Sequence, residues 1–215
     1  MTSVPIRFHK KWEKIKIPKI PDNLVKRIKV VNAKINSGVP NFEKLEAVYA
    51  LSDQFNSEYV AKFAVCQKGC NHCCKIDVSV SLLEAEYITF KGGPQYDMSP
   101  GKTENNRTDC PFLAKEGTCT IYDTRPFFCR TFHTLDDPEY CAERDEKHQV
   151  YGSASTGYGN FFYAGAAGWL KRIHDEKNSP YRDIRDWFPS SKPSDPPPKK
   201  SLWNSVVQRF QRQPV

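Results

Sequence analysis

The feature that most constrains this chain is the confinement of all its cysteines to one stretch. Eight cysteines fall within residues 66–141 of a chain of 215 residues, and two of them are adjacent. Clustered thiols in a chain without a recognisable export signal are typical of metal or redox sites in a reducing compartment, whereas in a short secreted chain they predict disulfides. We therefore expect a cytoplasmic metal-binding protein, with a disulfide framework as the less favoured alternative. The candidate ligands are Cys66, Cys70, Cys73, Cys74, Cys110, Cys119, Cys129 and Cys141.

The spacing of these cysteines favours metal binding but leaves the metal open. Gaps of two or three residues let a chain turn and aim two sulfurs at one ion, and such thiolate sets suit zinc or an iron–sulfur cluster. Eight thiols divide naturally into two four-ligand sites, although the spacing does not determine the partition. We expect adjacent Cys73 and Cys74 to point in different directions, so that they serve two sites or one of them bridges two metals. His72 and His133 lie within the cluster and are candidates to replace a thiol.

Four residues near Cys129 are candidates to surround the metal ligands without binding the metal. Thiolate-rich sites carry a net negative charge, which an arginine that donates to the sulfurs offsets. Asp123 would then orient Arg125. In the alternative interpretation, Asp123 and Arg125-Pro126 only form a turn. The candidates are Tyr122, Asp123, Arg125 and Arg130.

No residue in the sequence is singled out as catalytic. The histidines are scattered, and we expect His148 and His174 to lie on the surface. Paired carboxylates such as Asp136-Asp137 are more typical of solvated helix faces than of acid–base chemistry. A cysteine nucleophile of lowered pKa is an alternative if the metal sites use fewer than eight thiols.

The net charge of +7 is concentrated near the start of the chain. Residues 1–29 hold nine basic and two acidic residues, whereas the rest of the chain is neutral overall. Residues 7–29 interleave lysines with aromatic and isoleucine side chains, a pattern found in segments that contact nucleic acid or an anionic membrane surface. A solvated segment, one that docks on the body of the protein itself, or one that docks on a protein partner explains the same pattern. No stretch is long and apolar enough to predict a transmembrane segment.

Periodicity and capping residues predict a helix-rich chain. Apolar and aromatic residues recur at helical spacing over 41–66, where Asn41 would be the N-cap, and Asp22 would cap a shorter helix before it. Ser81 and Glu84 have the spacing of a capping box at the start of another helix. Further elements are expected as a strand over 119–122 and a helix over 161–176.

Together these patterns predict an α+β fold: a small, irregular, α-rich domain organised around a cysteine-ligated metal cluster, with basic N- and C-terminal arms. Prolines before residue 41 and a Pro-rich stretch from residue 189 mark the limits of the domain. The expected parts are a basic N-terminal arm (1–40), a metal-binding domain (41–188, motif core 66–141), and a Pro-rich linker with a C-terminal docking segment (189–215).

Several linked motifs within residues 66–141 match one known pattern. They are Cys66-Gln-Lys-Gly-Cys70-Asn-His-Cys73-Cys74, Cys110-Pro-Phe-Leu, Cys119-Thr-Ile-Tyr, and Arg125-Pro-Phe-Phe-Cys129-Arg-Thr-Phe. In these motifs the chain resembles the YkgJ-type cysteine-cluster family, also called the CxxCxxCC family. One departure is the extra residue between Cys66 and Cys70, which weakens the assignment of Cys66.

The resemblance implies a domain that chelates zinc or iron. Flagellin lysine N-methylases, which are related to this family, carry a similar cluster, and this implies an iron–sulfur or methyl-transfer role as an alternative. The favoured hypothesis is a metal-binding protein whose metal organises the fold for an interaction or regulatory role. The second is an iron–sulfur redox or protein-modifying enzyme, and the third is nucleic-acid binding through the basic arms.

Overall fold

The computed structural model describes residues 13–66, 69–99, 108–142, 148–152 and 158–189. The predicted linker and docking segment lie, from residue 190 on, outside the described residues. The α-helices are α1 (Asp22–Ile35), α2 (Asn41–Glu58), α3 (Leu82–Phe90), α4 (Phe127–Thr131), α5 (Phe161–Lys177) and α6 (Ile184–Trp187). The 3-10 helices are η1 (Val60–Lys62), η2 (His72–Lys75), η3 (Tyr122–Thr124) and η4 (Pro138–Ala142), and the strands are β1 (Ser79–Ser81), β2 (Phe132–Thr134), β3 (Val150–Gly152) and β4 (Tyr181–Asp183).

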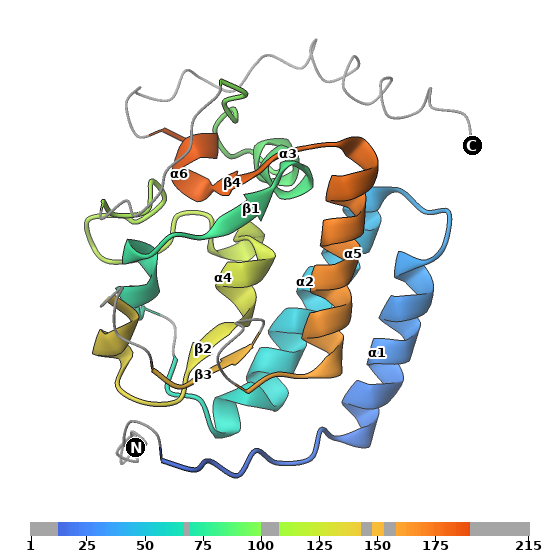
Figure 1. Ribbon diagram of the computed structural model, residues 1–215, viewed down its shortest axis with the longest axis vertical. Coiled ribbons are helices and arrows are strands. Elements are labelled where there is room, and N and C mark those ends of the chain that lie inside the picture. The colour runs from blue at the N-terminus through green and yellow to red at the C-terminus, as the bar shows by residue number, and fades with distance from the viewer. Residues whose placement is uncertain (1–12, 67–68, 100–107, 143–147, 153–157, 190–215) are drawn as a thin grey trace.

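The long helices lie together on one side of the molecule and the short elements on the other (Figure 1). α1, α2 and α5 form the helical side. β1 pairs antiparallel with β4, and β2 pairs antiparallel with β3, as two separate two-stranded sheets. Val80 is paired with Arg182 in the first sheet, and His133 with Tyr151 in the second. This mixture of helices and small sheets confirms the predicted α+β class.

α2 carries the helical periodicity that the sequence predicted. Leu45, Val48 and Phe55 recur at helical spacing, and all three are fully buried. The helix was expected to reach residue 66, but it ends at Glu58 and one 3-10 turn, η1, follows. Tyr59 leaves the helical backbone conformation, and its hydroxyl donates to the Pro18 carbonyl (2.5 Å). A long-range contact therefore ends the helix earlier than periodicity predicted.

The predicted N-caps of the first two helices are wrong by one residue. Asp22 and Asn41 are the first helical residues, and the N-cap positions belong to Pro21 and Pro40. Both prolines have an extended ψ, and their carbonyls accept the first backbone hydrogen bond of each helix. Proline suits this place because its fixed φ is compatible with the helix start and its missing N–H is not needed there.

The predicted capping box at the start of α3 is confirmed, and it has a wider role. The Ser81 hydroxyl accepts from the Glu84 N–H (3.3 Å), while the Ser81 N–H and hydroxyl both donate to Glu84 Oε2 (3.0 and 2.8 Å). Glu84 Oε1 accepts from the Tyr49 hydroxyl (3.0 Å) and from the Phe127 N–H (2.7 Å). This fully buried carboxylate therefore joins α3 to α2 and to the first turn of α4.

α5 confirms the helix expected over 161–176. Asn160 is its N-cap, and the Asn160 side chain accepts from the Tyr163 N–H (2.9 Å). Trp169 and Leu170 are buried against the helical side of the molecule. The helix ends at Asn178, which adopts the left-handed conformation common after a last helical turn.

A second, smaller apolar cluster supports the loops that carry cysteines. Val80 of β1 and Trp187 of α6 are fully buried in it, and the Phe112 ring packs on the Phe188 ring (5.0 Å between centroids). Phe112 stands two residues after Cys110. The strand expected over 119–122 is replaced by an isolated bridge between Leu113 and Cys119, followed by η3.

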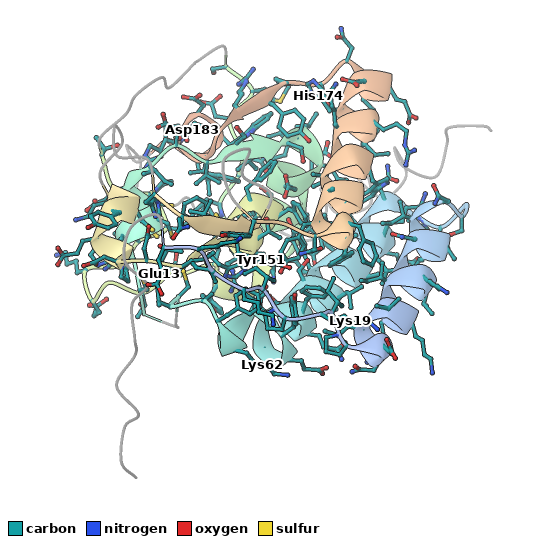
Figure 2. All side chains as sticks on the ribbon, turned by 60° about the horizontal axis from the view of Figure 1, so that its bottom comes forward. Glu13, Lys19, Lys62, Tyr151, His174 and Asp183 are labelled. Carbon is teal, nitrogen blue, oxygen red and sulfur yellow. The ribbon has the colours of Figure 1, made fainter. Side chains whose placement is uncertain are left out.

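The predicted N-terminal arm is, from residue 13 to residue 40, part of the folded unit. Ile15, Leu24 and Ile28 are buried in the main apolar cluster with α2 and α5. Figure 2 shows the segment from Glu13 to Lys19 crossing the surface beside Tyr151. The Glu13 carbonyl there accepts from the Gln149 side chain (2.8 Å). Burial of isoleucine and leucine side chains favours this packing, which agrees with the alternative of a segment that docks on the body of the protein.

Candidate metal centre

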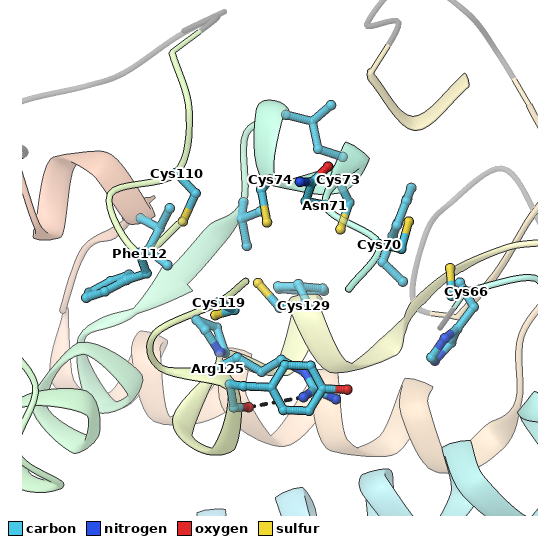
Figure 3. Close-up of a pocket in the computed structure, with 18 of the residues that line it drawn as sticks. Cys66, Cys70, Asn71, Cys73, Cys74, Cys110, Phe112, Cys119, Arg125 and Cys129 are labelled. Carbon is cyan, nitrogen blue, oxygen red and sulfur yellow. Dashed lines mark hydrogen bonds between the residues drawn. The ribbon is translucent and has the colours of Figure 1, made fainter. Parts of the chain in front are cut away.

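Seven of the eight cysteines line one cavity of about 700 Å³. They come from the loop before η2, η2 itself, the loop before η3, and α4. Figure 3 shows the sulfurs of Cys74, Cys119 and Cys129 pointing toward one another, with Cys66 and Cys70 farther along the cavity. Cys141 in η4 is buried, and its thiol hydrogen-bonds Thr134. All eight are described residues, and none forms a disulfide, so the disulfide framework is not observed.

Short backbone contacts position the first cysteines. Gly69 has a φ of 96°, a conformation that favours glycine, and this lets the chain turn sharply just before Cys70. The Cys74 N–H donates to the Asn71 carbonyl (2.9 Å), which closes the turn that begins η2. The Cys110 N–H then donates to the Cys74 carbonyl (2.9 Å). This last bond brings together two cysteines that lie far apart in the sequence.

Four sulfurs form a first group, which we call the first thiol set: Cys74, Cys110, Cys119 and Cys129. The pKa of Cys110 is raised to about 12, mainly by burial and in part by the neighbouring sulfurs of Cys74 and Cys119. Burial likewise raises the pKa of Cys129 well above its usual value, and the other three sulfurs of the set add to the rise. These mutual effects show that the four sulfurs are close neighbours, because like charges raise one another's pKa only at short range.

Three sulfurs form a second group, which we call the second thiol set: Cys66, Cys70 and Cys141. Burial raises the pKa of Cys141 to about 12, and the sulfurs of Cys66 and Cys70 raise it further. Burial also raises the pKa of Cys66 to about 11, with an added effect of Cys70. Cys73 hydrogen-bonds Cys74, and this contact is the largest cause of the raised pKa of the Cys74 thiol. The adjacent pair therefore does not diverge as predicted.

Three sulfurs already accept hydrogen bonds from backbone N–H groups. The Thr134 N–H donates to Cys66 Sγ (3.2 Å). Backbone hydrogen bonds from Phe112 to Cys110 and from Ile121 to Cys119 lower the pKa of each thiol against the larger effect of burial. A donor aimed at sulfur stabilises the thiolate rather than the thiol. These donors offset part of the effect of burial at the three sulfurs.

The donor set fits a thiophilic metal. Buried thiolates are costly unless a cation compensates them, and these thiols hold their protons because burial opposes ionisation. Among the described residues, no three Cys, His, Asp or Glu side chains meet at a point that would hold one ion. Each thiol can rotate about a single χ1 bond, which changes the position of its sulfur.

The cysteine-bearing segment has a family assignment. Residues 65–151 match the CxxCxxCC family, described as a "putative zinc- or iron-chelating domain". The match confirms the resemblance in the cysteine motifs, and it supports binding of zinc or iron. No curated protein and no solved structure matches the chain.

Of the four residues expected around the metal ligands, Tyr122 and Arg125 line the cavity. Arg130 is buried, and its guanidinium donates to Asp53 (2.5 Å), to the Arg125 carbonyl (2.8 Å) and to the Asp123 carbonyl. Arg125 donates to the Tyr122 carbonyl (3.0 Å) and pairs with Asp53 (3.3 Å). Asp53 of α2, not Asp123, therefore orients Arg125. Sequence reasoning missed Asp53 because it lies outside the cysteine motifs.

Arg185 supports the CxxCxxCC domain from outside the matched segment. It is buried in α6 and donates to the carbonyls of Cys74 (3.0 Å), Thr108 (2.8 Å) and Ile76 (3.2 Å). Asp183 binds the same guanidinium (3.0 Å). Arg185 thus holds the loops that carry Cys74 and Cys110. Its positive charge lowers the pKa of both thiols, although burial and neighbouring sulfurs raise the pKa of each by more.

A buried polar network stands behind the second thiol set. Asp136 is fully buried and accepts from Thr134 Oγ1 (2.9 Å), His148 Nδ1 (2.8 Å) and the Gln149 N–H (2.8 Å). The expectation that His148 lies on the surface is wrong, and so is the expectation of a solvated Asp136. Because the two residues satisfy each other's hydrogen bonds, both are tolerated in the interior. Thr134 connects this network to Cys66 and Cys141.

His133 lines the same cavity and is 8% exposed. Its ring hydrogen-bonds the Arg130 carbonyl, whereas Nε2 is buried without a hydrogen-bond partner among the described residues. Burial lowers the pKa of His133 to about 4, and Arg125 lowers it further, so the ring is neutral at physiological pH. His72 is half-buried in η2 and lies outside the set of described residues that line the cavity.

Proposed function

We propose that the cavity of the CxxCxxCC domain is a metal centre whose cysteines hold zinc or iron. One observation carries this conclusion: seven free thiols from separate parts of the chain share one cavity. An apolar core would not use so many thiols, because each is only a small hydrophobic group. The family match to a zinc- or iron-chelating domain supports the same conclusion independently.

The eight cysteines fall into groups that suit two metal positions. The first thiol set offers four sulfurs, the number that a tetrahedral structural site requires. The second thiol set offers three, and Cys73 lies between the two sets in Figure 3. Arg125, Arg130 and Arg185 stand around the first set and offset part of the negative charge of its thiolates.

The metal organises the fold in this proposal. The loops that bring Cys70, Cys73 and Cys110 to the cavity contain only short 3-10 turns and few backbone hydrogen bonds. Metal–thiolate bonds would supply the stability that these loops lack, since the free energy of metal binding is then part of the free energy of folding. The ordered loops would present a surface to a protein partner, which gives an interaction or regulatory role.

Elemental analysis of the full-length protein, purified without oxygen, tests the proposal. The expected result is about two zinc or iron atoms per chain. Cys110→Ser and Cys129→Ser are each expected to lose about one of them, because each removes a ligand of the first set. Substitution of a fully buried serine that does not line the cavity, Ser52→Ala, serves as the matched control and keeps the full content. Wild-type protein without bound metal would refute the proposal.

An iron–sulfur redox or modifying enzyme is the second candidate, and the size of the cavity favours it. A volume of about 700 Å³ is within the range of cavities that bind small molecules, whereas structural zinc sites are closed. Apolar side chains such as Phe112, Phe128 and Ile121 share the lining with the cysteines. The absorbance spectrum separates the two candidates: an iron–sulfur protein is brown, and a zinc protein is colourless.

A further inference from the structure

One polar atom in the cavity has no partner that the fold supplies. His133 Nε2 is buried and makes no hydrogen bond with the described residues, although the rest of its ring is fixed. Burial keeps the ring neutral, and a neutral imidazole protonated at Nδ1 offers a lone pair at Nε2. A buried imidazole nitrogen without a partner is costly, so native structures rarely keep one without a reason.

β2 places this nitrogen at the end of the cavity that holds the second thiol set. Thr134 follows His133 directly, and its N–H donates to Cys66 Sγ (3.2 Å). The Thr134 carbonyl accepts from the Val65 N–H (3.1 Å), so β2 runs beside the chain that leads into Cys66. The Thr134 hydroxyl also contacts the Cys141 thiol. His133 therefore directly precedes a residue that contacts both Cys66 and Cys141, and its own side chain lines the same cavity as Cys66.

The second thiol set lacks a fourth donor. The sulfurs of this set raise one another's pKa. Cys73 instead raises the pKa of Cys74, which is a member of the first thiol set. Three thiolates and one imidazole are an established ligand set for structural zinc. They also carry less negative charge than four thiolates, an advantage in a buried place.

We propose that His133 Nε2 is a metal ligand, which completes with Cys66, Cys70 and Cys141 a site for a divalent ion of the zinc class. A backbone hydrogen bond of the ring with Arg130 supports this role, since ligating histidines commonly bind a carbonyl through their other nitrogen. The inference rests on the proposed metal centre and adds a nitrogen donor to it.

Cobalt(II) is the probe that tests this assignment, because its absorbance reports both sulfur and nitrogen ligands. Full-length wild type, His133→Ala, His133→Cys and the control His72→Ala are stripped of metal and titrated with cobalt(II) without oxygen. His133→Ala is expected to bind one cobalt at least about 10-fold more weakly, with a changed d–d spectrum. His133→Cys is expected to restore that cobalt and to add thiolate-to-cobalt charge transfer. His72→Ala should resemble wild type.

If a substitution of the buried His133 prevents folding, a measurement on wild-type protein still tests the inference. In protein labelled with ¹⁵N at histidine, the Nε2 signal of His133 is expected to shift when zinc is added, while that of His72 stays in place. An unshifted His133 signal in zinc-loaded protein would overturn the inference, and so would His133→Ala with the affinity and spectrum of wild type. Wild type that binds no zinc or cobalt would instead overturn the metal centre itself.

Discussion

Glu84→Gln tests how strongly the buried carboxylate holds three helices together. Glu84 accepts four hydrogen bonds, two from Ser81, one from Tyr49 and one from Phe127. A glutamine replaces one oxygen by an NH₂ group. In either orientation of the amide, one backbone N–H, of Ser81 or of Phe127, then faces another donor, whereas the hydroxyls can rotate to accept.

The cost follows from this geometry. One buried N–H without an acceptor costs about 1–3 kcal/mol, and the remaining bonds weaken because the acceptor loses its charge. The substitution is therefore expected to lower the free energy of unfolding by about 3 kcal/mol, which corresponds to roughly 6–12 °C in Tm for a chain of this size. Urea unfolding of metal-free protein, followed by circular dichroism, measures the loss.

The matched control is Glu43→Gln, the same substitution at an exposed position of α2. It is expected to change the free energy of unfolding by less than about 0.5 kcal/mol. If Glu84→Gln were as harmless as this control, the assignment of Glu84 as the shared acceptor would be wrong. A large loss for both variants would point to a general effect of charge.

Three further outcomes are expected. Arg185→Lys should lower the free energy of unfolding by about 2–4 kcal/mol and weaken metal binding about 10-fold or more, because a lysine cannot donate to all three of these partly buried carbonyls. Urea unfolding and a metal-competition assay measure the two effects. Metal-free protein should lose stability as the pH rises from about 9 to about 12, because thiols such as Cys66 and Cys110 hold their protons to a higher pH in the folded state than in the unfolded state. Measuring the free energy of unfolding at a series of pH values checks this. Zinc binding at pH 7 should release protons, which calorimetry in two buffers of different ionisation enthalpy detects.

The helices were predictable wherever the signal was local. Ser81 and Glu84 are three residues apart, and their capping box was read from spacing alone. α5 was likewise predicted within a residue of its end. The predicted caps Asp22 and Asn41 were displaced because the preceding prolines took that position. Local rules thus located the helices better than they located the residue that begins each one.

The assembly of the site was not predictable, because its supports are long-range. Arg185 binds the Cys74 carbonyl across 111 residues, and Arg130 binds Asp53 across 77. Every residue has a backbone carbonyl, so the sequence does not reveal which of them an arginine binds. A buried arginine that binds carbonyls therefore cannot be told from a surface arginine by sequence. Asp136 and His148 were misread as exposed for the same reason, since each is buried only through the other. The cysteines were recognised as a cluster, but their grouping into sets required the fold.

The contact between Arg185 and the cysteine loops has a consequence for how the protein is made. Translation proceeds from the N-terminus, so every cysteine of the chain emerges from the ribosome before Arg185 does. Until then the loops of Cys74 and Cys110 lack the guanidinium that holds their carbonyls. The nascent chain therefore presents open thiols to the cell for the time needed to add the last segment of the fold. Metal delivered early meets flexible ligands, and oxidants compete for them during the same interval.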